Sequence, residues 1–131
     1  RLAISNSLNG SLLIDDSYNS NPASLKNAVD SLEGLERKKV CILGDMKELG
    51  SDSQKIHQEM YEYISERVDH IFCIGDEWST CSPNEKQDLS IFENQDDLYS
   101  HLISIIDKKT ILLVKGSRST RMDLLADKLK E

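Results

Sequence analysis

Short apolar runs alternate along the chain with longer segments in which apolar residues recur at helical spacing. This pattern predicts strands at residues 2–7, 11–14, 39–44, 70–75, 91–92 and 110–114, and helices at residues 23–35, 51–67, 95–107 and 119–130. Strands that alternate with helices are typical of a parallel sheet. The segment between the fourth and fifth strands, residues 76–90, is polar and poorly patterned, and we expect it to be an excursion at the surface.

The internal strands are continuous apolar runs, such as the stretch VCIL within residues 39–44 and ILLV within residues 110–114. Such runs are expected where helices cover a sheet on both faces. The first two strands are joined through Asn9-Gly10, a pair that favours a tight hairpin. The sequence therefore predicts an α/β fold with a Rossmann-like, doubly wound, mostly parallel sheet. Helices cover both of its faces, and the N-terminal hairpin adds an antiparallel edge.

Composition narrows the class of protein. The 131 residues are enough for one domain, so residues 1–131 are expected to form a single unit. Sixteen basic and 23 acidic residues give a net charge of −7, which disfavours nucleic acid and anionic membranes as partners. Three cysteines without a Cys-x-x-Cys motif are typical of a reducing, cytoplasmic setting. The three histidines have no metal-site spacing and are expected at the surface or half-buried, at positions His57, His70 and His101.

Polar residues and glycines follow four of the predicted strands. The pairs are Asp15-Asp16, Gly44-Asp45, Gly75-Asp76 and Lys115-Gly116. In an open parallel sheet, ligands bind beyond the carboxyl ends of the strands. We therefore expect these four turns to gather at one edge and to form the functional site.

The stretch DDSYNSNPASL, residues 15–25, combines a structural signal with a functional one. Asn21 is suited to cap a helix that begins with Pro22, because proline lacks only an amide that would be unpaired there. Capping does not account for the two aspartates. Their carboxylates need donors, which could be backbone amides or the paired hydroxyls of a ribose.

Two further turns admit both a structural and a ligand-binding interpretation. The loop LGDMKELGSDS, residues 43–53, could approach a ligand closely or simply lead into the next helix. The segment VKGSRSTR, residues 114–121, places Lys115, Ser117, Arg118 and Arg121 around a glycine. These residues and the first amides of a helix could bind an anion, or the cations could neutralise nearby carboxylates. Neither G-x-x-x-x-G-K-[ST] nor G-x-G-x-x-G occurs, and no nucleophile with its base stands out, so we expect no catalytic residue in this domain.

Three motifs, DDSYNSNPASL, LGDMKELGSDS and LVKGSRSTRMD, occur in an order that resembles the C-terminal domain of the Mur ligases. The likeness runs from about Leu13 to Leu129 and is strongest to the type that adds D-Ala-D-Ala to UDP-N-acetylmuramoyl-tripeptide during peptidoglycan synthesis. The resemblance implies a three-domain cytoplasmic enzyme in which ATP phosphorylates the terminal carboxylate and the dipeptide amine attacks the acyl phosphate. The phosphate loop and the Mg²⁺ ligands would lie in a central domain, the UDP-sugar would be held mainly by an N-terminal domain, and this domain would be an excised closing lid, inactive alone.

The resemblance also assigns roles to individual residues. Asp16 would hold the ATP ribose, and Tyr18, Asn19 and Asn21 would line the same cleft. The dipeptide and the phosphates would be contacted on closure by Gly44, Asp45, Met46, Lys115, Gly116, Ser117 and Arg118. The chain has Ser20 where the motif commonly has alanine and Asp123 where glutamate is usual. Two alternatives stay open: a stand-alone Rossmann-like binding module, and the C-terminal domain of another Mur-type or folylpolyglutamate-type ligase.

Overall fold

The computed structural model describes residues 4–86 and 89–130. Within these residues, one sheet has the strand order β1-β2-β6-β3-β4-β5. The strands are β1 (Ile4–Asn6), β2 (Leu12–Asp16), β3 (Lys38–Gly44), β4 (His70–Ile74), β5 (Leu89–Phe92) and β6 (Thr110–Lys115). All neighbouring pairs are parallel except β1 and β2, which are antiparallel. The predicted sheet with one antiparallel edge is confirmed.

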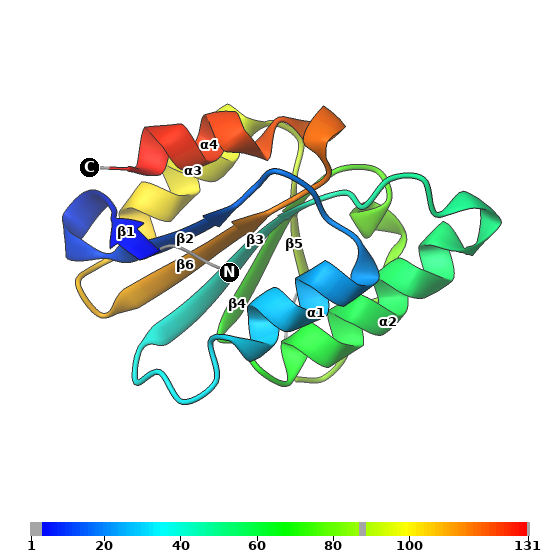
Figure 1. Cartoon of the computed structure of the whole chain (residues 1–131), viewed down its shortest axis with the longest axis horizontal. Helices are drawn as coiled ribbons and strands as arrows, with labels where there is room; N and C mark the ends of the chain where they lie inside the picture. The colour runs from blue at the N-terminus through cyan, green and yellow to red at the C-terminus, as the bar shows by residue number, and fades with distance from the viewer. Residues whose placement is uncertain (1–3, 87–88, 131) are drawn as a thin grey trace.

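Helices cover the sheet on both faces (Figure 1). Helices α1 (Pro22–Asp30) and α2 (Ser53–Ser65) lie on one face, and α3 (Gln95–Ile105) and α4 (Met122–Leu129) lie on the other. Each face has its own apolar core: Leu25 and Ile64 belong to the first, and Leu102 and Leu125 to the second. This confirms the doubly wound arrangement. None of the helices within the described residues is long and apolar enough to cross a membrane.

The N-terminal hairpin forms where the Asn-Gly pair predicts it. Asn9 and Gly10 have φ values of 60° and 80°, the left-handed conformation that a tight hairpin turn requires. The turn places Ile4 opposite Ile14 across the two strands. Positive φ at two successive residues is easiest for asparagine followed by glycine, so the local sequence accounts for this turn.

Two helices differ from the prediction at their ends. The helix expected to run to residue 35 ends at Asp30, and a short hydrogen-bonded turn follows it. The last helix begins at Met122 after a short 3₁₀ turn, Arg118–Thr120. Arg121 separates the two with a left-handed φ of 53°, which interrupts the helical hydrogen bonding.

The prediction that residues 76–90 form an excursion at the surface is wrong for part of this segment. It contains the 3₁₀ turn Trp78–Thr80, and the indole of Trp78 is fully buried, with Nε1 donating a 2.8 Å hydrogen bond to the carbonyl of Gly44. The expectation for His57 is also wrong, because its side chain is fully buried and meets the Trp78 ring edge-on at 4.6 Å between centroids. Residues 87 and 88 lie outside the described part of the chain.

Candidate functional site

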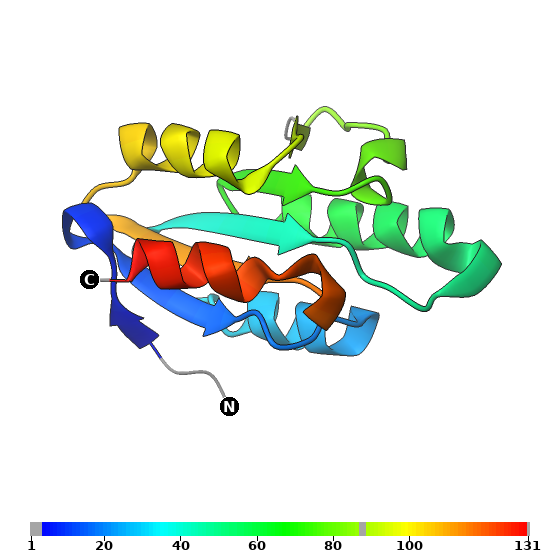
Figure 2. The ribbon, with the colours of Figure 1, turned by 90° about the horizontal axis from the view of Figure 1, so that it is seen from above.

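The carboxyl ends of β2, β6, β3 and β4 meet at one edge of the sheet. These four strands are adjacent and parallel, and Figure 2 shows the arrowheads of β2, β3 and β4 pointing the same way. The four polar turns expected to gather there do so. This edge is the candidate site.

Asp16 and Lys115 form an ion pair at the centre of this edge. They are in-register neighbours on β2 and β6, and Nζ of Lys115 lies 2.9 Å from Oδ2 of Asp16. The same ammonium donates a 2.7 Å hydrogen bond to the carbonyl oxygen of Asn19. The Lys115 side chain is 1% exposed, whereas that of Asp16 is 28% exposed. Lys115 therefore bridges the end of β2 and the turn that follows it, and Asp16 remains accessible from outside.

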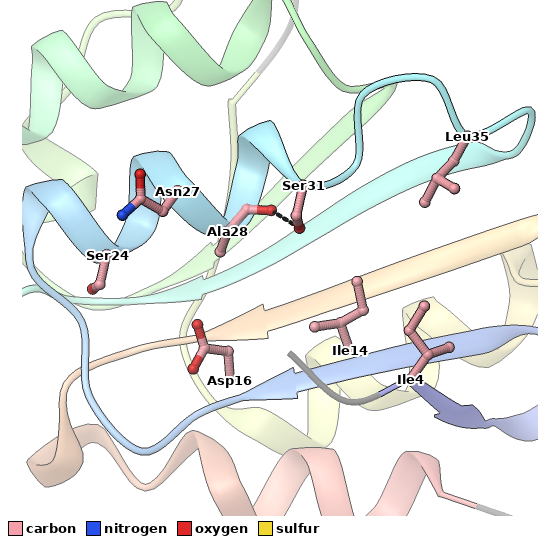
Figure 3. A pocket seen from close by; sticks show the side chains of 8 residues that line it. All are labelled: Ile4, Ile14, Asp16, Ser24, Asn27, Ala28, Ser31 and Leu35. Carbon is pink, nitrogen blue, oxygen red and sulfur yellow. Dashed lines mark hydrogen bonds between the residues drawn. The ribbon is translucent and has the colours of Figure 1, made fainter. Parts of the chain in front are cut away.

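A groove of about 620 Å³ begins at Asp16 and lies between α1 and the hairpin (Figure 3). Side chains of β1, β2, α1 and the segment after α1 line it: Ile4, Ile14, Asp16, Ser24, Asn27, Ala28, Ser31 and Leu35. Of these, only Asp16 was expected from the sequence. Ser24, Asn27 and Ser31 recur every three or four residues, so their shared side of α1 is a signal that the sequence does contain.

Tyr18 and Arg118 meet in a second cavity at the same edge. Tyr18 is 68% exposed, and the guanidinium carbon of Arg118 lies 4.6 Å from the centre of its ring. The cavity measures about 360 Å³ and is lined by these two side chains together with Ser17, Arg121 and Asp123. The structure thus joins one residue of the expected ATP set to one of the expected substrate set.

Arg121 and Asp123 form an ion pair beside this cavity, with Nε of Arg121 3.0 Å from Oδ1 of Asp123. The hydrogen bond from Arg121 holds the pKa of the Asp123 carboxyl below its ordinary value. Arg121 was expected in the anion cradle of this segment, although the resemblance assigned it no ligand; anion binding by Arg121 stays a prediction.

The two aspartates of the first motif have different partners. Asp15 accepts hydrogen bonds from the backbone amide and the hydroxyl of Ser17, and it lies 2.8 Å from Nζ of Lys130. Burial alone would raise the pKa of Asp15, but Lys130 and Ser17 lower it overall. The hydrogen-bond donors that the Asp15 carboxylate needs are therefore supplied by the protein itself. Asp16 is the carboxylate that lines the groove.

The asparagines of the motif act locally in this structure. Asn21 caps α1: its side chain accepts a 2.9 Å bond from the amide of Ser24, whose hydroxyl in turn accepts from the amide of Asn21. This confirms the predicted cap. Asn19 takes part in the site through its backbone carbonyl, which accepts from Lys115. Contact of either asparagine with ATP stays a prediction.

Asp45 connects the turns that follow three of the strands through hydrogen bonds. The residue is 3% exposed, and its carboxylate accepts one hydrogen bond of 3.2 Å from each of the backbone amides of Glu77 and Trp78, in the turn after β4. Its carbonyl accepts from the amide and the hydroxyl of Ser117, in the turn after β6, at 3.1 and 2.9 Å. The Asp45 side chain therefore points into the protein. A direct contact with substrate stays a prediction.

The neighbours of Asp45 are also packed inside. Met46 is 1% exposed, and its backbone amide donates a 3.1 Å bond to Nε2 of His57. A Cβ atom added to Gly44 would lie 2.8 Å from a side-chain carbon of Met122, and one added to Gly116 would lie 3.2 Å from Cα of Gly44. These two glycines let the turns after β3 and β6 pack against each other. His57 supports this loop, a role that was not expected from the sequence.

Neither a metal site nor a reactive thiol is found among the residues that the structure describes. No group of three or more His, Cys, Asp or Glu side chains that could hold a metal ion occurs there. Cys41, Cys73 and Cys81 are free and buried. Burial raises the pKa of Cys41 to about 12 and that of Cys81 to about 11, which keeps both thiols protonated near neutral pH.

Comparison with known proteins agrees with this geometry. Residues 1–118 match the family described as Mur ligase, glutamate ligase domain. A UDP-N-acetylmuramoyl-tripeptide–D-alanyl-D-alanine ligase of Buchnera aphidicola is 39% identical over 127 residues, which cover 92% of this chain and 27% of that protein. The crystal structure of MurF from Acinetobacter baumannii superimposes with a TM-score of 0.83 at 33% identity, covering 98% of this chain and 29% of that one.

A second solved structure was determined with a nucleotide. MurF ligase from Thermotoga maritima in complex with ADP superimposes with a TM-score of 0.80 at 25% identity, over 95% of this chain and 29% of that one. The chain thus spans less than a third of the length of each of these relatives. Since the family match covers most of its residues, the chain belongs to the Mur ligase family, as a glutamate ligase domain.

Proposed function

We propose that this chain is the C-terminal domain of an ATP-dependent ligase that adds D-Ala-D-Ala to UDP-N-acetylmuramoyl-tripeptide in the cytoplasm. Relatives that carry the name of this ligase align with nearly the whole chain. Membership in the Mur ligase family argues against the alternative of a binding module unrelated to ligases. The alternative of a different ligase of the family is tested by the dipeptide dependence described below.

The observation that carries the proposal is the position of the Asp16 carboxylate. It lies at the head of the groove, at the carboxyl edge of the sheet, with one oxygen held by Lys115. An ionised carboxylate is an acceptor-only group, so it suits a pair of hydroxyl donors such as the 2′ and 3′ hydroxyls of a ribose. In our proposal Asp16 binds the ATP ribose, and Mg²⁺ is held by the central domain of the ligase.

Arg118 supplies the second part of the proposal. Its guanidinium is exposed and lies over Tyr18 in a cavity at the same edge, where it can meet an anion brought by the dipeptide or by the acyl phosphate. Arginine binds carboxylate and phosphate with two parallel hydrogen bonds, which fixes the orientation of the ligand. The Tyr18 ring limits the directions in which the guanidinium can move.

The test is steady-state kinetics of the complete ligase, with ATP and D-Ala-D-Ala varied separately. A hydrogen bond to a charged acceptor contributes about 1.5–3 kcal/mol, so Asp16→Ala should weaken ATP binding by about ten-fold or more and leave the dipeptide KM unchanged. Arg118→Ala should raise the KM for D-Ala-D-Ala or lower kcat. An unchanged dependence on ATP in the first variant contradicts the assigned role of Asp16.

Arg67→Ala is a matched control for Arg118→Ala. Arg67 also lies over a tyrosine, with its guanidinium carbon 3.6 Å from the centre of the Tyr63 ring, but it lies near the amino end of β4, away from the site. The control variant should show unchanged kinetics. If Arg67→Ala and Arg118→Ala behave alike, the arginine at the carboxyl edge has no special role in ligation.

A further inference from the structure

Lys115 is the most buried cation of the candidate site, and its surroundings do not suit direct contact with a substrate. Its side chain is 1% exposed. Of the three donors on its ammonium group, one points to Asp16 and another to the carbonyl of Asn19. The first acceptor is the last residue of β2, and the second lies in the turn between β2 and α1. An incoming anion would have to displace them.

We propose that Lys115 acts on the nucleotide through Asp16, as a positioning residue for the carboxylate that binds the ribose. The proposal rests on the proposed function of Asp16. Lys115 holds one carboxylate oxygen at 2.9 Å and thereby orients the carboxylate at the head of the groove. By holding the Asn19 carbonyl as well, it ties the turn after β2 to the end of β6. The direct contact with an anion expected for Lys115 from the sequence is left to Arg118.

The positive charge of Lys115 also affects how Asp16 can bind the nucleotide. Asp16 is only 28% exposed, so its charge is partly withdrawn from water and is balanced by the ammonium beside it. Without Lys115, the same carboxylate would be free to rotate and would repel the phosphates of an approaching nucleotide. The loss should therefore appear in ATP binding and not in dipeptide binding.

A double-mutant cycle in the complete ligase tests the proposal, with Asp16→Asn, Lys115→Met and the combined variant. Methionine keeps the apolar stem of lysine and removes the charge. We expect Lys115→Met to weaken ATP binding about ten-fold, in line with the loss of a charged hydrogen bond, and to leave the KM for D-Ala-D-Ala unchanged. In the Asp16→Asn background the same substitution should change ATP affinity by less than about two-fold, because its effect passes through Asp16.

Two results would overturn the proposal. One is a raised dipeptide KM with unchanged ATP affinity in Lys115→Met, which would make Lys115 a direct ligand of the dipeptide. The other is a loss of ATP affinity that simply adds to that of Asp16→Asn, which would make Lys115 an independent ligand of the nucleotide. Normal ATP affinity of Asp16→Asn alone would instead contradict the proposed function, so the two failures are distinguishable.

The controls separate positioning from a general effect on folding. Lys128→Met removes an exposed lysine that pairs with Asp96 at 3.4 Å on the other side of the sheet, and its ATP affinity should equal that of the unchanged ligase. If Lys115→Met does not fold, Lys115→Gln replaces it in the cycle, because glutamine removes the positive charge while its amide still offers a hydrogen bond to the buried acceptors. The same non-additivity with Asp16→Asn is expected, and additive losses refute the proposal there too.

Discussion

Replacing Asp45 by asparagine should destabilise the 131-residue domain strongly, although the two side chains have nearly the same size. The Asp45 carboxylate is almost fully buried, and each of its oxygens accepts one backbone amide, from Glu77 and from Trp78. Asparagine has a single acceptor oxygen. One buried amide would then face the NH₂ group of asparagine, donor against donor.

The magnitude follows from these contacts. A hydrogen bond to a charged acceptor contributes about 1.5–3 kcal/mol, and a buried donor without a partner costs about 1–3 kcal/mol. Lys47, whose Nζ lies 3.6 Å from the carboxylate, is 48% exposed and adds only about 0–1 kcal/mol. We therefore expect Asp45→Asn to lower the free energy of unfolding by about 2–4 kcal/mol.

Urea denaturation followed by circular dichroism measures this change. Asp76→Asn is the matched control, because it makes the same chemical change at an exposed aspartate near the same turn and should shift the free energy by less than about 0.5 kcal/mol. If Asp45→Asn is no less stable than Asp76→Asn, the carboxylate of Asp45 is not a structural acceptor. Its predicted role as a substrate contact would then become the better explanation for the aspartate of the GDM loop.

Two further substitutions test local parts of the fold. Asn21→Ala removes the acceptor for the amide of Ser24 and should cost about 1 kcal/mol of unfolding free energy in urea titrations; an unchanged midpoint would show that the cap contributes nothing. Lys130→Met tests the lowered pKa of Asp15. A lowered pKa in the folded state gives stability that is present above the ordinary pKa of 3.8 and is lost as the pH falls, so the stability difference between Lys130→Met and the unchanged domain should be present at about pH 6 and shrink in more acidic solution. A difference that persists undiminished in acid would contradict the ion pair as its source.

The order of elements could be predicted from the sequence because most of them carry a clear period. The continuous apolar runs of β3 and β6 and the helical spacing of α2 and α3 identify their elements without tertiary information. The position of the site at the carboxyl edge then follows from the alternation of strands and helices.

The buried side chains that support the turns at this edge could not all be predicted in the same way. Trp78 lies in a polar segment, and its burial depends on a turn that is held by Asp45, far away in the sequence. His57 is different, because its burial was predictable. It stands at spacings of three, four and seven residues from Met60, Tyr61 and Ile64, all on the buried side of α2.

The alternation of side chains along β2 explains why two aspartates follow each other at the end of this strand. Successive residues of a strand point to opposite faces of the sheet. Leu13 belongs to the core beneath α3 and α4, and Ile14 to the core beneath α1 and α2. Asp15 follows the alternation of Leu13 and pairs with Lys130, just beyond α4. Asp16 follows the alternation of Ile14 and lines the groove beside α1. One aspartate therefore joins the strand to the residue that follows the last helix, and the alternation of side chains places the other on the face of the sheet where the groove lies.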